Sequence, residues 1–135
     1  MNEITLKATI ENIPQATAFI DEALEAAACS MTAQMQIDVA MDELFGNIAR
    51  YAYAPGEGEA TVRFHFQEET RTASITLIDS GIPFNPLSVA EPDTTSAAQD
   101  RPIGGLGIFL VRKTMDDMAY EYRDGKNILT IRKKI

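Results

Sequence analysis

Cysteine is almost absent from this sequence, with Cys29 the one residue of its type among 135. A lone cysteine excludes an internal disulfide and fits a reducing compartment, so we expect a cytoplasmic protein. Long apolar runs are absent too, whereas a membrane-spanning helix needs about 20 consecutive apolar residues. No apolar segment follows a basic cluster at the start of the sequence, so no secretory signal is predicted. We therefore expect no membrane partner.

Positive charge is scarce: 12 Lys and Arg residues stand against 20 Asp and Glu residues, which gives a net charge of −8 at pH 7. Proteins that bind nucleic acid use clustered basic side chains, so no direct nucleic-acid partner is expected. His65 is the sole histidine and has no second histidine or cysteine near it in the sequence, which argues against a zinc site. An acidic chain that binds a polyanion must rely on backbone N–H groups, a helix N-terminus and a metal ion.

Length and composition are those of a single domain over 1–135, because 45% hydrophobic and 24% charged residues are ordinary globular usage. Alternating apolar and polar residues predict strands, and three- to four-residue spacing predicts helices. The expected elements are a strand at 3–10, helices at about 14–30 and 33–53, strands at 59–67 and 72–79, a helix at 106–117, and two strands around 120–122 and 127–132. They predict an α+β fold, a two-layer α/β sandwich in which about three helices cover one face of a mixed, mostly antiparallel sheet.

The predicted helix at 33–53 carries an apolar stripe and a polar stripe. The apolar stripe, expected to face the core, consists of Ile37, Met41, Leu44, Ile48 and Tyr51. Met31 and Met35 are also expected to fill the core. On the polar stripe Glu43 and Asn47 lie one turn apart and project side by side, with Gly46 beside them. An amide oxygen suits magnesium and a carboxylate can accept a proton, so the pair can serve one site; a solvated polar face is the alternative.

Asp79 ends the predicted strand at 72–79 and leads into a turn at Gly81. A carboxylate at the end of a strand, above the core, can accept a hydrogen bond from an amino group such as the adenine amine. Gly81 lets the backbone run close to a ring. An ordinary Asp-Ser-Gly turn is the alternative interpretation.

Glycines at 104, 105 and 107 run directly into the predicted helix at 106–117. Backbone N–H groups at the positive end of a helix favour phosphate. The segment is neither a Walker loop, because no Gly-Lys-Ser/Thr follows, nor a Rossmann loop, because its spacing and preceding strand differ. A flexible loop end is the alternative. Before it, residues 85–103 show little periodicity, and so long a loop in a compact domain is typical of a functional lid.

In this order along the chain, the three motifs resemble the ATPase domains of the GHKL superfamily, which includes histidine kinases, DNA gyrase, the heat-shock chaperone and mismatch-repair proteins. The resemblance spans essentially the whole sequence. It is closest to the stand-alone bacterial anti-sigma-factor serine/threonine kinases, because the segments 79–86 and 104–116 are similar to that branch. Where many relatives have a histidine four residues after the asparagine, this sequence has Tyr51, which we expect to be a change in packing.

The resemblance implies a site for ATP and Mg²⁺. The implied residues are Glu43 as general base, Asn47 as magnesium ligand and ATP contact, Asp79 and Gly81 at the adenine, and Gly105, Leu106 and Gly107 at the phosphates beneath the lid. The motifs do not assign the cation that meets the terminal phosphate. Arg101 in the lid and Arg50 on the second helix are the candidates, and Lys113 is a further alternative.

The resemblance further implies a serine/threonine protein kinase that transfers the γ-phosphoryl group of Mg-ATP to a seryl hydroxyl of an anti-anti-sigma antagonist protein. The same protein would bind a sigma factor, and a homodimer is consistent with the resemblance. Two alternatives stay open: an ATP-dependent partner-switching binding module without significant catalysis, and a detached histidine-kinase catalytic domain. Acid lability of the product distinguishes the latter, because phosphohistidine is acid-labile and phosphoserine is not.

Overall fold

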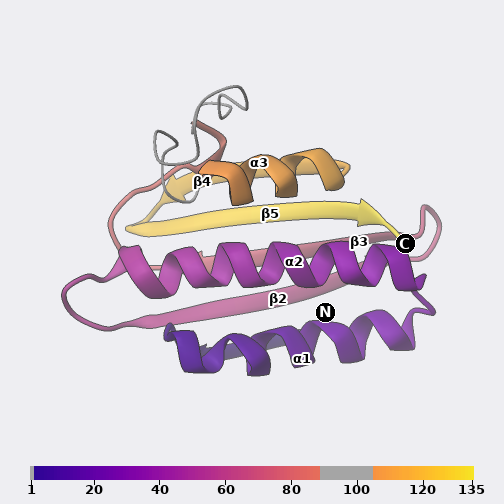
Figure 1. Cartoon of the computed structure of the whole chain (residues 1–135), viewed down its shortest axis with the longest axis horizontal. Helices are drawn as coiled ribbons and strands as arrows, with labels where there is room; N and C mark the ends of the chain where they lie inside the picture. Colours follow the sequence, from indigo (N-terminus) through magenta and orange to yellow (C-terminus); the bar gives the residue numbers. More distant parts are fainter. Residues whose placement is uncertain (1, 89–104) are drawn as a thin grey trace.

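Five strands form one sheet, in the order β1-β2-β3-β5-β4, in the computed structural model of the chain, which describes residues 2–88 and 105–135 (Figure 1). The strands are β1 (Asn2–Lys7), β2 (Glu59–Gln67), β3 (Thr72–Asp79), β4 (Asp117–Arg123) and β5 (Lys126–Lys134). The longer helices are α1 (Ile13–Ala26), α2 (Met31–Asn47) and α3 (Gly105–Thr114). The shorter helical turns are η1 (Ile10–Asn12), η2 (Ile48–Ala52) and η3 (Pro86–Ser88). None of the described helices has the length and apolar character that a membrane-spanning helix requires.

Every pairing between these strands is antiparallel. β3 and β4 run in the same direction, but β5 lies between them and pairs with both. The three longer helices lie side by side over one face of the sheet (Figure 1). The predicted two-layer α+β fold is therefore confirmed, and the described strands make its sheet wholly antiparallel rather than mixed.

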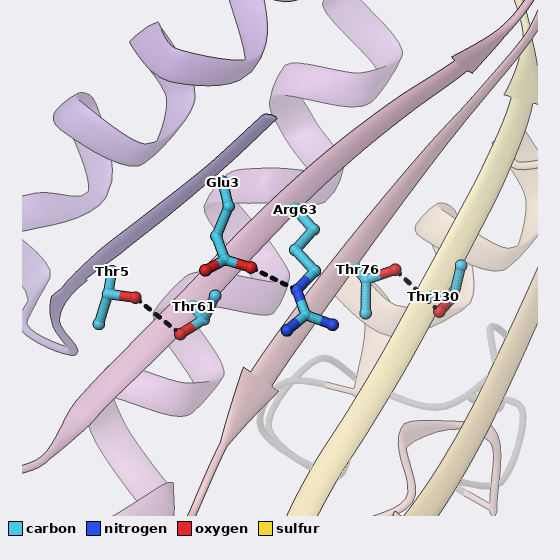
Figure 2. A network of polar contacts seen from close by, with 6 residues as sticks. All are labelled: Glu3, Thr5, Thr61, Arg63, Thr76 and Thr130. Carbon is cyan, nitrogen blue, oxygen red and sulfur yellow. Dashed lines mark hydrogen bonds and ion pairs between the residues drawn. The ribbon is translucent and has the colours of Figure 1, made fainter. Parts of the chain in front are cut away.

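The two faces of the sheet differ in chemistry. On the face beneath the helices, alternate residues of the inner strands are buried: Ala60, Val62, Phe64, Ala73, Ile75, Leu77, Leu129 and Ile131. Paired polar side chains lie on the other face, and Figure 2 shows three such pairs, Glu3–Arg63, Thr5–Thr61 and Thr76–Thr130. Asp79 has the parity of the buried residues of β3, so it belongs to the helix-covered face.

Helix α2 packs between α1 and α3 (Figure 1). It begins after Ser30, whose Oγ accepts a capping hydrogen bond from the Ala33 N–H at 3.2 Å. The prediction that Met31 and Met35 fill the core is wrong, because these side chains are 79% and 62% exposed. Each lies two residues before a buried position, at Ala33 and Ile37, which places it about 200° away around the helix.

The helix changes from α to π geometry at η2, directly after Asn47. A π turn holds more residues than an α turn, so side chains beyond Ile48 are rotated away from the α-helical stripe. Ile48 itself still packs against the core, as expected. Tyr51 is 49% exposed, and the prediction that it packs in the core is wrong for this reason.

A pair of carboxyl groups lies between α1 and α2. The buried Oδ1 atoms of Asp21 and Asp38 meet no donor group among the described residues. Burial, followed by a hydrogen bond with Asp21 and the charges of Asp21 and Glu25, raises the pKa of Asp38 to about 7. One proton shared between the two carboxyl groups satisfies both of them. The pair therefore links α1 to α2 best when it is protonated once.

We expect the free energy of unfolding to fall as the pH rises from about 5 to about 8, because the folded protein binds this proton more tightly than the unfolded chain does. The stabilisation is complete below the pKa of an unfolded aspartate and is lost as the pH passes about 7. Asp38→Asn should remove about 1–2 kcal/mol of this dependence, measured by denaturant unfolding. Asp42→Asn, at an exposed position of the same helix, is the control. An unchanged pH dependence in Asp38→Asn would contradict the shared proton.

Candidate functional site

Asp79 is the last residue of β3 and is almost fully buried, with 6% of its surface exposed. Its Oδ1 atom accepts two hydrogen bonds, from the Gly81 N–H at 2.9 Å and from Asn127 Nδ2 at 2.9 Å. A buried carboxylate is costly unless it is hydrogen-bonded, so these donors hold the group in place. Oδ2 accepts no hydrogen bond from the described part of the chain, which leaves one acceptor for a ligand.

The turn after Asp79 is hydrogen-bonded to the end of η2, the helical turn that continues α2. The Ile82 N–H donates to Ala52 O at 2.9 Å, and the Ser80 N–H donates to the Tyr53 hydroxyl at 2.7 Å. At Gly81 there is no room for a side chain, because a Cβ there would lie 2.2 Å from Ala52 O. Gly81 is thus required by a contact with the helix end, and its contact with an adenine ring stays a prediction.

Three residues that the sequence reasoning missed complete this end of the site: Tyr53, Tyr120 and Asn127. Asn127 is buried and lies opposite Asp79 in the pairing of β3 with β5. The Tyr120 hydroxyl donates to Asn127 Oδ1 at 2.5 Å. Burial raises the pKa of both tyrosines. Pairing the two predicted strands in register would have placed a polar residue opposite Asp79, and that is the signal by which Asn127 could have been found.

Glu43 and Asn47 lie side by side on α2, as their spacing predicted, and both are partly buried. Burial raises the pKa of Glu43, the charge of Arg50 lowers it, the charge of Asp42 raises it, and a hydrogen bond with the Asn47 side chain lowers it. Arg50 folds back over Gly46, so that a Cβ on this glycine would lie 2.8 Å from Arg50 Nη1. A carboxylate and an amide on α2 and a cation on η2 therefore gather on one stretch of the α2–η2 segment.

Helix α3 begins at Gly105, so the N–H groups of Gly105, Leu106 and Gly107 lie in its first turn, at its positive end. A Cβ at Gly107 would lie 2.2 Å from the carboxyl carbon of Glu43. The absence of a side chain at Gly107 thus lets this turn approach the Glu43 carboxylate directly. The glycine motif and the Glu43–Asn47 motif meet here.

Two predicted parts of the site fall wholly or largely outside the described residues. Arg101 is one, and the lid at 85–103 is the other, of which only 85–88 are described. Lys113, the further alternative for the phosphate cation, stands in the last turn of α3 beside the Phe109 ring. That position is about 9 Å along the helix from Gly107, which favours Arg50 over Lys113.

The helical segment formed by α2 and η2 connects both ends of the candidate site. Glu43 meets the first turn of α3, and Ala52 holds the turn after Asp79. The nine steps from 43 to 52 correspond to roughly 13 Å at 1.5 Å per residue. ATP likewise has two chemically different ends, the adenine base at one and the phosphates at the other. The Asp79 end suits the base, and the Glu43 end suits the phosphates.

The side-chain oxygens near Asn47 are suited to a magnesium ion that binds together with the nucleotide. Among the described residues no group of three or more His, Cys, Asp or Glu side chains could hold a metal ion. Magnesium is usually bound through one or two protein oxygens, with water and phosphate oxygens filling the other positions. The Asn47 amide supplies an oxygen of that kind.

Comparison with known proteins identifies the family of this chain. A family model described as the histidine kinase-like ATPase domain matches residues 6–133. Serine/threonine-protein kinase BtrW of Bordetella bronchiseptica is 31% identical over 90 residues, which are 67% of this chain and 63% of that protein. Serine-protein kinase RsbW of Bacillus mycoides is 30% identical over 95 residues, 67% of this chain and 58% of that protein. The chain thus matches less than two thirds of the length of these relatives.

A solved structure with a similar fold is the Acinetobacter baumannii histidine kinase AdeS. The TM-score is 0.52, and the match covers 99% of this chain and 68% of that one at 13% sequence identity. At that identity the likeness shows a shared fold and nothing about activity. It agrees with the two-layer α+β architecture described above.

Proposed function

This chain belongs to the family of histidine kinase-like ATPase domains, and from that premise we propose that it is a serine/threonine protein kinase that binds Mg-ATP. Its relatives BtrW and RsbW are both named as protein kinases, which supports this activity. The proposed substrate is a seryl hydroxyl of an anti-anti-sigma antagonist protein. The same chain, as a homodimer, would bind a sigma factor, and these partners would place it in the cytoplasm.

One observation carries the proposal: three motifs that are far apart in the sequence are joined by the α2–η2 segment. The Asp79 turn is bonded to Ala52 at the C-terminal end of this segment, and Gly107 contacts Glu43, nine residues earlier in it. Phosphoryl transfer depends mainly on positioning and on neutralising charge. One helical segment that brings an adenine site near Ala52 and a phosphate site near Glu43 supports that requirement.

In the proposed reaction the seryl oxygen forms a bond to the γ-phosphorus, the bond from this phosphorus to the β–γ bridging oxygen breaks, and ADP leaves. Glu43 accepts the hydroxyl proton, and the burial that raises its pKa makes it a better acceptor. Asn47 would hold magnesium, and the charge of the ion would offset that of the phosphates. The N–H groups at the start of α3 bind phosphate oxygens. Arg50, beside Glu43, or Arg101 meets the γ-phosphate.

Incubation of the purified chain with γ-labelled Mg-ATP and its cognate antagonist is the direct test. The expected result is label on the antagonist that survives acid, because phosphoserine is stable to acid. Label that acid releases would indicate phosphorylation of histidine instead. An antagonist that gains no label would contradict the kinase proposal.

Asp79→Asn is expected to weaken ATP binding about 30- to 100-fold, or about 2–3 kcal/mol. Two donors meet Oδ1, so an asparagine must turn its oxygen toward them. Its NH₂ group then takes the place of Oδ2 and faces the adenine amine, donor against donor. Calorimetric titration with ATP measures the loss.

The matched control is Asp124→Asn. It makes the same carboxylate-to-amide replacement at an exposed position in the β4–β5 turn. This variant should bind ATP like the wild type. If Asp79→Asn also kept wild-type affinity, the adenine contact assigned to Asp79 would be wrong.

A further inference from the structure

Asn127 is buried, with 6% of its surface exposed, and its side chain makes four hydrogen bonds. Nδ2 donates to Asp79 Oδ1 and to Ile82 O, both at 2.9 Å. Oδ1 accepts from the Phe84 N–H at 3.0 Å and from the Tyr120 hydroxyl at 2.5 Å. A carbonyl can only accept and an amide N–H can only donate, so Ile82 and Phe84 together leave this side-chain amide one orientation.

The four bonds use the whole capacity of the amide, which has two N–H donors and two acceptor positions. They tie the end of β3, the residues that follow it and strand β4 to a single side chain on β5. A nucleotide that bonded directly to Asn127 would have to displace one of these partners. Asn127 therefore acts on a ligand through Asp79.

The effect of Asn127 on Asp79 is to decide which carboxylate oxygen is available. Oδ1 lies between the Gly81 N–H and Asn127 Nδ2 and accepts from both. Turning the carboxylate would break these bonds in a buried position, which is costly. Oδ2 is thus kept as the acceptor that faces outward from the pair.

We propose that Asn127 is a positioning residue that makes the site selective for a purine with a 6-amino group. With Oδ2 held in place, a 6-amino group meets an acceptor, whereas the 6-oxo group of a guanine nucleotide places one acceptor against another. A site built around a polar group rejects the analogue that cannot pair with it. This inference rests on the ATP site proposed above and adds to it a residue on β5.

The test uses two nucleotides that differ only at the purine 6-position: ATP, and purine riboside 5′-triphosphate, in which hydrogen replaces the amine. Wild-type protein is expected to bind ATP at least about 30-fold more tightly. Asn127→Ala is expected to lose about tenfold in ATP affinity and less than about threefold in affinity for purine riboside triphosphate. GTP affinity relative to ATP should rise in the same variant. A purely structural defect would weaken both purine nucleotides by the same factor, because they share the ribose and the phosphates.

Two comparisons isolate the route through Asp79. In an Asp79→Asn background, Asn127→Ala should leave the ratio of the two affinities unchanged, because the group on which it acts has been replaced. Thr130→Val is the matched control on β5: it removes the Thr76–Thr130 hydrogen bond between the same two strands on the opposite face (Figure 2). That control should bind both nucleotides like the wild type.

Equal losses for both nucleotides, or an unchanged ratio, would overturn the role of Asn127. If thermal unfolding without nucleotide shows that Asn127→Ala does not fold, Tyr120→Phe carries the test, because it removes one donor to Asn127 and keeps the other contacts. Tyr120→Phe should lower the ATP preference about threefold, and an unchanged preference would overturn the proposal. Wild-type protein that binds neither nucleotide would contradict the ATP site itself, which is a different result.

Discussion

Replacing Glu43 with glutamine is expected to slow phosphoryl transfer about 10²- to 10⁴-fold while ATP affinity changes less than about threefold. Glutamine keeps the size of the side chain and its hydrogen-bonding to Asn47, but it cannot take the proton of the seryl hydroxyl. The contact with Gly107 makes an isosteric replacement necessary, because the first turn of α3 lies directly against this carboxylate. Single-turnover transfer of labelled phosphate measures the rate, and equilibrium titration measures the affinity.

Asp42→Asn is the control for this experiment, since it removes one negative charge at the neighbouring, exposed position of the same helix. Its transfer rate should stay within about twofold of wild type. A Glu43→Gln variant as fast as the wild type would contradict Glu43 as the general base. Suppose that Glu43→Ala preserved sigma-factor control while Asp79→Asn abolished it. The domain would then be an ATP-dependent binding module rather than a kinase.

The second large effect is expected at Gly81. Gly81→Ala should lower the free energy of unfolding by about 3 kcal/mol, which corresponds to about 10 °C in melting temperature. The added Cβ would lie 2.2 Å from Ala52 O and 2.6 Å from Ala52 C, and backbone atoms cannot rotate away as a flexible side chain can. The turn after Asp79 must therefore separate from the helix end and lose the Ile82–Ala52 hydrogen bond. ATP affinity should fall more than about tenfold with it.

Gly125→Ala separates this clash from the general cost of replacing a glycine. Gly125 has a φ of +76°, so alanine is strained there, but its Cβ would meet no atom within 4 Å. We expect a loss of about 1–2 kcal/mol in unfolding free energy and no change in ATP affinity. Thermal unfolding and ATP titration of both variants provide the comparison. Equal loss of ATP binding in the two would contradict the role assigned to the contact at Ala52.

Much of the fold was predictable because its signals are local. The strands expected at 59–67 and 72–79 are β2 and β3 to the residue, since alternate side chains of each are buried. The proximity of Glu43 and Asn47 was predictable as well, because residues four apart are neighbours on any helix. The same kind of local pattern indicated the start of α3 within one residue.

What could not be predicted depends on packing between distant segments. Periodicity groups residues into stripes but does not say which apolar stripe faces the sheet, so Met35 was placed in the core although it is exposed. It also gives no sign of the π turn that moves Tyr51 to the surface. Asn127 has no local signal of its own, because its importance arises from its register opposite Asp79 across two strands.

The order of strands has a consequence for how the protein is made. β5 is the last strand in sequence, yet it lies inside the sheet, between β3 and β4. A nascent chain leaving the ribosome therefore carries β3 with one open edge until Lys126–Lys134 have emerged, a state in which edge pairing with other chains is a hazard. Over the same interval Asp79 lacks the hydrogen bond that Asn127 donates to it in the folded protein. Nucleotide can thus stabilise this domain only after Asn127 has emerged and β5 has paired with β3.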